Sequence, residues 1–133
     1  MPPSYNKLCE SSYLTSDLII CPVNDDSFSI ESLKLTIEDI EESCDEYEAN
    51  KPDIRVLKNR FSSDRRRRAG KDAEAELNRE FAEIILPIHI RSGTCIKNTV
   101  NDGISIFDRS IKDKQIEDIR LSFNELLSTV YSQ

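Results

Sequence analysis

The chain of 133 residues has one histidine and no tryptophan, and only three glycines and five prolines. So little glycine and proline argues against low-complexity disorder and against a turn-rich all-β sandwich. No apolar run approaches the roughly 18 residues of a membrane-spanning helix, so no membrane partner is expected. The N-terminus has no basic stretch before an apolar run, which predicts no secretory signal and a cytoplasmic location.

Residues suited to metal or nucleophilic chemistry are few. His89 stands alone, and the cysteines are widely separated, with no Cys-x-x-Cys, at Cys9, Cys21, Cys44 and Cys95. Zinc sites need clustered thiolates or imidazoles, so we predict no metal site and four reduced, partly buried thiols. The sequence also lacks a glycine-rich phosphate loop and a Gly-x-Ser-x-Gly elbow. No catalytic residue is therefore predicted.

Charge is unevenly distributed along the chain. The formal net charge is -7, and residues 24–50 contain ten acids and one base, Lys34. Residues 51–71 contain nine bases against Asp53 and Asp64, which is half of the 18 bases in the chain. A basic stripe of this kind attracts phosphates even on an acidic protein. The alternative is a solvated loop that is balanced by the neighbouring acidic helix.

Apolar periodicity predicts a single α/β domain over residues 1–133. Three short apolar runs are typical of buried strands: Asp17–Val23, Ile54–Asn59 and Ile84–Leu86, the last closed by Pro87. Helical spacing follows over residues 30–47, from about 72 to 81, over 94–101 and from about 113 to 130, with a loop over residues 60–70. This alternation predicts a partial parallel sheet with flanking helices and right-handed crossovers.

In such sheets, ligands bind beyond the carboxyl ends of the strands. Residues 24–26, 59–61 and 87–91 are expected to meet at that edge. Asn24-Asp25-Asp26 fits the acidic pocket of a receiver domain or, in the favoured interpretation, an acidic cap for the next helix.

Two features near the second strand have alternative interpretations. The amide of Asn59 suits the edge of an adenine ring, although an asparagine at this point is also an ordinary turn residue. Four consecutive arginines, Arg65, Arg66, Arg67 and Arg68, favour phosphate or carboxylate partners, or form a solvated loop.

Short motifs follow one another along the chain in a characteristic order. They begin with Pro2-Pro3-Ser4, Leu14-Thr-Ser-Asp17, Leu18-Ile-Ile-Cys-Pro-Val23 and Phe28-Ser-Ile-Glu31. They continue with Asn59, Phe61-Ser-Ser-Asp-Arg65, Pro87, Arg91, Gly103 and Asp108. Together they cover essentially the whole chain and resemble the ParA/Soj branch of the deviant Walker A, MinD-related partition ATPases. The resemblance implies the C-terminal part of a P-loop NTPase fold of the SIMIBI type.

Parts of the family pattern have no counterpart in this sequence. Met1 occupies the position next to the switch-loop aspartate, and the phosphate loop, the switch I aspartate and the first strands of the sheet are missing. The resemblance therefore implies a C-terminal half without its phosphate loop. We expect no ATP hydrolysis by the chain alone, and an open sheet edge that invites self-association.

The resemblance also implies roles for individual residues. Asn59 would bind adenine and Pro87 would wall the ring, while Pro2 and Pro3 would belong to the switch loop near a dimer face. Arg91 matches an arginine that the family uses for non-specific DNA contact, and Arg65–Arg68 would assist DNA binding or a partner contact.

The implied function is plasmid or chromosome partition. ATP and magnesium are implied by the family only, and no cofactor is expected for the isolated chain. Implied partners are non-specific DNA, bound weakly, a ParA-like dimer partner and a ParB-like centromere-binding protein, in the cytoplasm at the nucleoid or a plasmid. The alternatives are a non-catalytic accessory or inhibitory subunit that pairs with a full-length ParA-type ATPase, and a non-functional remnant.

Overall fold

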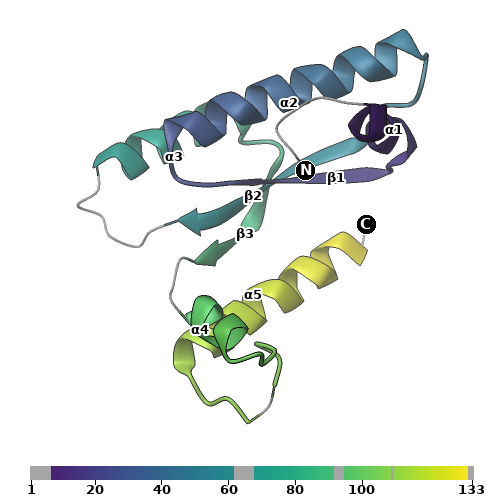
Figure 1. Ribbon diagram of the computed structural model, residues 1–133. Helices are drawn as coiled ribbons and strands as arrows, with labels where there is room; N and C mark the ends of the chain where they lie inside the picture. The colour runs from purple at the N-terminus through teal and green to yellow at the C-terminus, as the bar shows by residue number, and fades with distance from the viewer. Residues whose placement is uncertain (1–6, 62–67, 92–94, 109, 132–133) are drawn as a thin grey trace.

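The computed structural model describes residues 7–61, 68–91, 95–108 and 110–131 (Figure 1). Helices and strands alternate over most of this length. In chain order they are α1 (Lys7–Thr15), β1 (Leu18–Val23), α2 (Ser27–Glu46), β2 (Asp53–Phe61), α3 (Arg68–Phe81), β3 (Ile85–Arg91), α4 (Cys95–Asn101) and α5 (Lys114–Tyr131). None of the helices in these ranges is both long and apolar enough to cross a membrane.

The three strands form one parallel sheet in the order β1-β2-β3, which confirms the predicted α/β class. Between β1 and β2 the register is regular and runs from Leu18 opposite Asp53 to Val23 opposite Lys58. Helices α2 and α3 cover one face of the sheet, and α5 lies on the other (Figure 1). These faces are called the α2–α3 face and the α5 face below.

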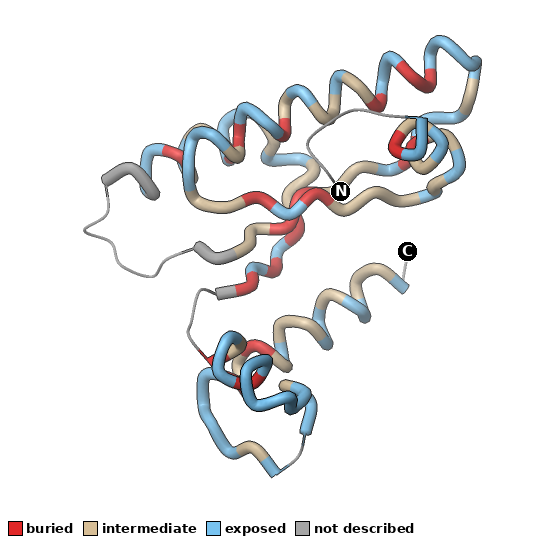
Figure 2. The backbone as a smooth tube through the Cα atoms, in the orientation of Figure 1, coloured by how far each residue is buried: buried red, intermediate tan, exposed pale blue. Residues whose placement is uncertain are grey.

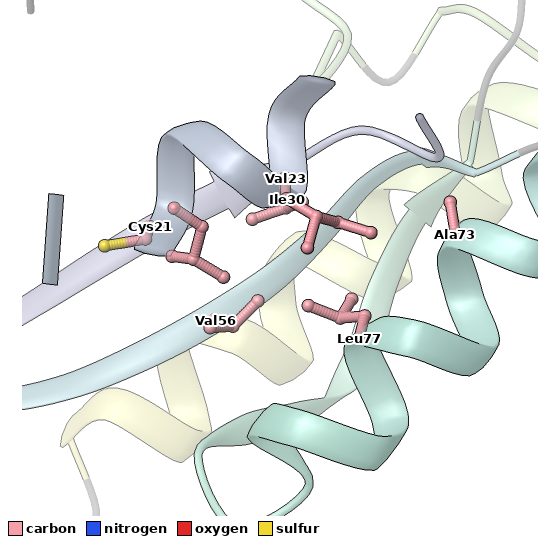
Figure 3. Packing of buried hydrophobic residues seen from close by; sticks show 7 residues of the cluster. Cys21, Val23, Ile30, Val56, Ala73 and Leu77 are labelled. Carbon is pink, nitrogen blue, oxygen red and sulfur yellow. The ribbon is translucent and has the colours of Figure 1, made fainter. Parts of the chain in front are cut away.

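The apolar core lies between the sheet and the α2–α3 face. Ile30 of α2, Val56 of β2 and Leu77 of α3 are each 0% exposed and meet there (Figure 3). Ile30 belongs to the predicted apolar stripe of α2, whose side chains recur at three- and four-residue steps and so fall on one side of the helix. This packing fixes both helices on the sheet.

Helix α1 extends the core at the amino end of the sheet. Its Cys9 and Tyr13 pack against Ile40 and Cys44 of α2. Figure 2 shows buried stretches on both helices. The sequence pattern did not predict α1, because only these two of its nine residues are buried and no apolar stripe marks it.

All four cysteines are buried, and none forms a disulfide within the described residues. Burial also raises the pKa of the Cys21 thiol, because the thiolate is disfavoured away from water. The thiols therefore act as small apolar side chains.

The α5 face is covered more sparsely. Leu57, Leu86 and Ile90 form a small buried cluster against which Phe123 and Leu126 of α5 pack. Contacts between α5 and the sheet are made mainly with β3. The side of the α5 face over β1 therefore has less helical cover than the side over β3.

The predicted ends of two strands and the start of one helix were wrong. Strand β2 continues past Asn59 to Phe61, and β3 runs through Pro87 to Arg91. Proline is tolerated in an edge strand because its missing N–H faces away from the neighbouring strand. Helix α3 begins at Arg68 rather than near Asp72, so the predicted loop over residues 60–70 is shorter at both ends.

The connection between α4 and α5 is held by one side chain of α5. Arg120 donates through Nε to the carbonyl oxygen of Ile106 and through its terminal nitrogens to those of Asp108 and Ile111. Asp108 accepts hydrogen bonds from the backbone and hydroxyl of Ser110, which lower the pKa of its carboxyl group. The connection is thus organised by polar contacts to its own backbone.

Candidate functional site

The carboxyl ends of all three strands lie at one edge of the sheet, because the strands are parallel. Phe61 and Arg91 are Cα partners at the ends of β2 and β3. Strand β1 ends at Val23, directly before the turn that contains Asp25. The chain also leaves β2 and enters α3 on this side of the sheet. The carboxyl edge is therefore the predicted location for a ligand or partner.

The turn after β1 is an acidic cap. Asp26 has extended backbone angles, and its carboxylate accepts a hydrogen bond from the backbone N–H of Ser29 at 2.6 Å. This geometry satisfies one free N–H at the start of α2 and confirms the capping interpretation for Asp26. Asn24 and Asp25 beside it are half-buried.

A triphosphate does not fit this turn. Residues 24–26 contain two carboxylates and no glycine, whereas phosphate-binding turns present backbone N–H groups without negative charge nearby. Repulsion between the carboxylates and the phosphates opposes binding here. The turn after β1 is therefore not suited to binding phosphates.

Asn59 lies in β2, half-buried, with Ile90 of β3 as its Cα partner. The preceding Lys58 points to the α2–α3 face, where its Nζ is 3.0 Å from Oε1 of Glu74 in α3. Because successive side chains of a strand alternate between faces, Asn59 points to the α5 face. Its amide is therefore placed on the opposite side of the sheet from Lys58.

Pro87 lies between two open hollows at the outer edge of β3. The first, of about 330 Å³, lies beside α3 and includes Lys58, Asn78 and His89 in its lining. The second, of about 450 Å³, lies beside α5 and includes Asn124 and Ser128. Pro87 and Ile88 line both hollows, and Asn59 lines neither.

The arrangement bears directly on the expected adenine site. Asn59 and Pro87 are on neighbouring strands, but Ile88 and His89 lie between Pro87 and Ile90, the partner of Asn59. The structure therefore does not bring Asn59 and Pro87 into one of these hollows. Their roles toward adenine stay predictions.

The sequence analysis did not predict that Lys58 and His89 lie together beside Pro87. Lys58 and His89 are Cα partners, so their side chains lie on the same face of the sheet. The sequence could have placed both on neighbouring strands. It could not have predicted that they are partners, because the register is irregular here. The stretch of β3 from Ile85 to His89 pairs with the shorter stretch of β2 from Val56 to Lys58.

The predicted DNA-contact residues lie only partly in the described residues. Arg68 is the first residue of α3 and Arg91 the last of β3, and their side chains are outside the described part of the chain. Arg65, Arg66, Arg67, Pro2 and Pro3 lie entirely outside the described residues. The backbone thus places Arg68 and Arg91 at the start of a helix and the end of a strand on the carboxyl side of the sheet.

Within the described ranges, no group of three or more His, Cys, Asp or Glu side chains is arranged to hold a metal ion. Comparison of the whole chain with protein-family models finds no match. A search of curated proteins finds no match either. The functional argument therefore depends on the residues and on the fold.

Proposed function

We propose that this chain is a ParA-like partition protein segment that binds DNA at the carboxyl edge of its sheet and does not hydrolyse ATP alone. The observation that supports it is the consecutive order of three parallel strands, with the arginine-rich segment between β2 and α3. Strand β2 ends and α3 begins, at Arg68, on the edge where α/β proteins bind ligands, and this supports the proposal.

Electrostatics supports a local rather than a global attraction to DNA. The whole chain has a net charge of -7, so a phosphate backbone is attracted only where bases are segregated from acids. The ten acids of residues 24–50 lie mainly on α2, so the negative charge is concentrated on that helix and is separate in sequence from the arginines. The carboxylates of Asp25 and Asp26 follow β1 at the same edge and repel phosphates, so we expect weak, strongly salt-dependent binding without sequence preference.

Replacing Arg65, Arg66, Arg67 and Arg68 with alanine is expected to weaken binding to a duplex at least tenfold at low salt. Each lost phosphate contact reduces the slope of log K against log salt by about 0.9. Fluorescence anisotropy with a labelled duplex at several salt concentrations measures both quantities.

A matched pair of double variants controls for net charge. Arg66→Ala with Arg67→Ala should weaken binding several-fold, whereas Lys51→Ala with Arg79→Ala should change it less than about twofold. Lys51 and Arg79 are exposed and lie at the opposite, amino edge of the sheet. Equal losses from the two pairs would remove the carboxyl edge as the DNA-binding surface.

The purified chain is also expected to show no ATP turnover. Adenine contacts without phosphate contacts leave a dissociation constant of about 1 mM at best. Phosphate release assays and isothermal titration with ATP and magnesium check both statements. Turnover, or a micromolar dissociation constant, would contradict the proposal.

A second candidate is the accessory subunit that pairs with a full-length relative. The apolar strand β1 at the edge of the sheet favours it, since such an edge readily binds another chain. Mixing the chain with a full-length ParA-type ATPase and measuring hydrolysis tests this candidate, and unchanged hydrolysis with no co-elution would count against it.

A further inference from the structure

The hollow between β3 and α3 lies where the pairing of β3 with β2 is irregular. Ile85 and His89 are the Cα partners of Val56 and Lys58, so β3 has more residues than β2 over this stretch. The three residues between Ile85 and His89 all line the hollow, whose volume is about 330 Å³. Irregularities of this kind occur preferentially at sheet edges and beside active sites, where they redirect side chains. The local pairing therefore accounts for a space at the outer edge of the sheet.

Three polar side chains line this hollow, from Lys58, Asn78 and His89. The side chain of Lys58 is 17% exposed, and its Nζ is 3.0 Å from Oε1 of Glu74. Glu74 is one helical turn before Asn78, so both lie on the same side of α3. The side chains of Asn78 and His89 have no hydrogen-bond or ion-pair partner in the part of the chain that the structure describes. An amide and an imidazole are thus available beside an ion pair.

The rest of the hollow is apolar. Its remaining lining comes from Ala82 of α3 and from Ile85, Leu86, Pro87 and Ile88 of β3. An aliphatic group that lies against this wall is removed from water, which favours its binding. Sites for small molecules usually have volumes of about 300–1,000 Å³, so this hollow suits a small ligand with an apolar portion.

The charges beside the hollow disfavour a simple ion. An anion that approaches Lys58 also approaches the carboxylate of Glu74, and a cation that approaches Glu74 also approaches Lys58. A ligand that carries both charges avoids this conflict, because each of its charged groups can face the opposite charge of the ion pair. The hollow therefore fits a small zwitterion with an aliphatic side chain.

We propose that the hollow between β3 and α3 binds a free aliphatic α-amino acid. Its carboxylate accepts hydrogen bonds from Lys58 and from a ring N–H of His89, and its ammonium donates to Glu74 and to the amide oxygen of Asn78. Its side chain lies against the apolar wall of β3.

This site is separate from the proposed DNA-binding edge. Asn78 is in the last turn of α3, whereas that edge is where α3 begins, at Arg68. The inference therefore goes beyond the proposed function and does not depend on it.

Titration of the full chain with leucine and two analogues tests the proposal. Isocaproate lacks the ammonium of leucine, and isoamylamine lacks the carboxylate. Leucine is expected to bind with a dissociation constant of about 1 mM, at least about fivefold more tightly than either analogue. Nuclear magnetic resonance should show shifts of the amide signals of Asn78, Ile88 and His89, and none at Leu121, which lines the other hollow.

Two asparagine variants form a matched pair. Asn78→Ala should weaken leucine binding at least about threefold, because it removes one hydrogen bond to the ligand. Asn124→Ala makes the same change at an exposed asparagine of α5 that lines the second hollow beside Pro87, and it should leave binding unchanged. The variant with alanine at residues 65–68 should also bind leucine normally, which separates this result from DNA binding.

Glu74→Gln tests the recognition of paired charges. The side chain of Glu74 is 47% exposed, so its replacement should leave the fold intact, and circular dichroism checks this. Without the carboxylate, leucine should bind at least about threefold more weakly, whereas isocaproate should bind at least about threefold more tightly. A purely structural role of Glu74 would not change the two affinities in opposite directions.

Three results would overturn the proposal. The absence of shifts at Asn78 and His89 with leucine at millimolar concentrations would show that the hollow holds no amino acid. Equal affinity for leucine and both analogues would remove the paired charges as the basis of recognition. Equal losses from Asn78→Ala and Asn124→Ala would mean that leucine does not bind in the hollow beside α3.

Discussion

Leu77→Ala is expected to lower the free energy of unfolding by about 2–5 kcal/mol. Leu77 is 0% exposed and belongs to the cluster that joins α3 to β1, β2 and α2 (Figure 3). Removing its side chain loses the transfer free energy of the buried carbons and leaves a cavity that the close-packed sheet fills only in part. For a domain whose total stability is about 5–15 kcal/mol, this is a large fraction.

Leu35→Ala is the matched control, because it makes the same substitution on the neighbouring helix α2. Leu35 is 62% exposed, so its replacement should change stability by less than about 0.5 kcal/mol. Urea unfolding followed by circular dichroism measures both variants. Equal shifts of the two midpoints would mean that Leu77 is not at the centre of the core.

Arg120→Met is expected to remove roughly 2–3 kcal/mol of stability and to release the connection between α4 and α5. Methionine keeps much of the aliphatic stem of Arg120 but leaves the carbonyl oxygens of Ile106, Asp108 and Ile111 without the guanidinium. Hydrogen bonds from a charged donor contribute more than neutral ones, so their combined loss is large for a surface connection.

The effect should be local as well as global. Amide exchange over residues 105–111 should accelerate at least roughly tenfold in Arg120→Met. Arg120→Lys should behave similarly, because an ammonium cannot reproduce the planar fork that reaches separate carbonyl groups. Arg79→Met, an exposed arginine of α3, is the control and should leave exchange over residues 105–111 unchanged. Unaltered exchange in both Arg120 variants would contradict this role.

The parts of the fold that periodicity determines could be predicted from the sequence. The stripe from Ile30 to Cys44 predicted α2 because burial on one side of a helix requires that spacing. The apolar run of β1 likewise predicted a strand. Apolar periodicity did not predict helix α1, because this helix is held by two buried side chains, Cys9 and Tyr13, rather than by an apolar stripe.

The site was less accessible to prediction, and β3 shows why. Ile88 and Ile90 are buried and alternate with exposed His89, which is a strand signal. Pro87 outweighed that signal in the sequence, because proline removes a ladder donor. Whether a proline ends a strand or lies on its outer side depends on which neighbour the strand pairs with, and that is decided by tertiary structure. The two residues that β3 gains around Pro87 relative to β2 also separate Asn59 from Pro87.

The unequal edges of the sheet have a consequence for aggregation. A fibre grows only when each added molecule offers a fresh edge to the next, as in head-to-tail stacking. Here β1 leaves one edge of the described sheet open, while Pro87 and the irregular stretch around it block growth from the other edge. Any strand-mediated assembly of this protein should therefore stop at a single pair, even at the concentrations at which open-edged sheets form fibrils.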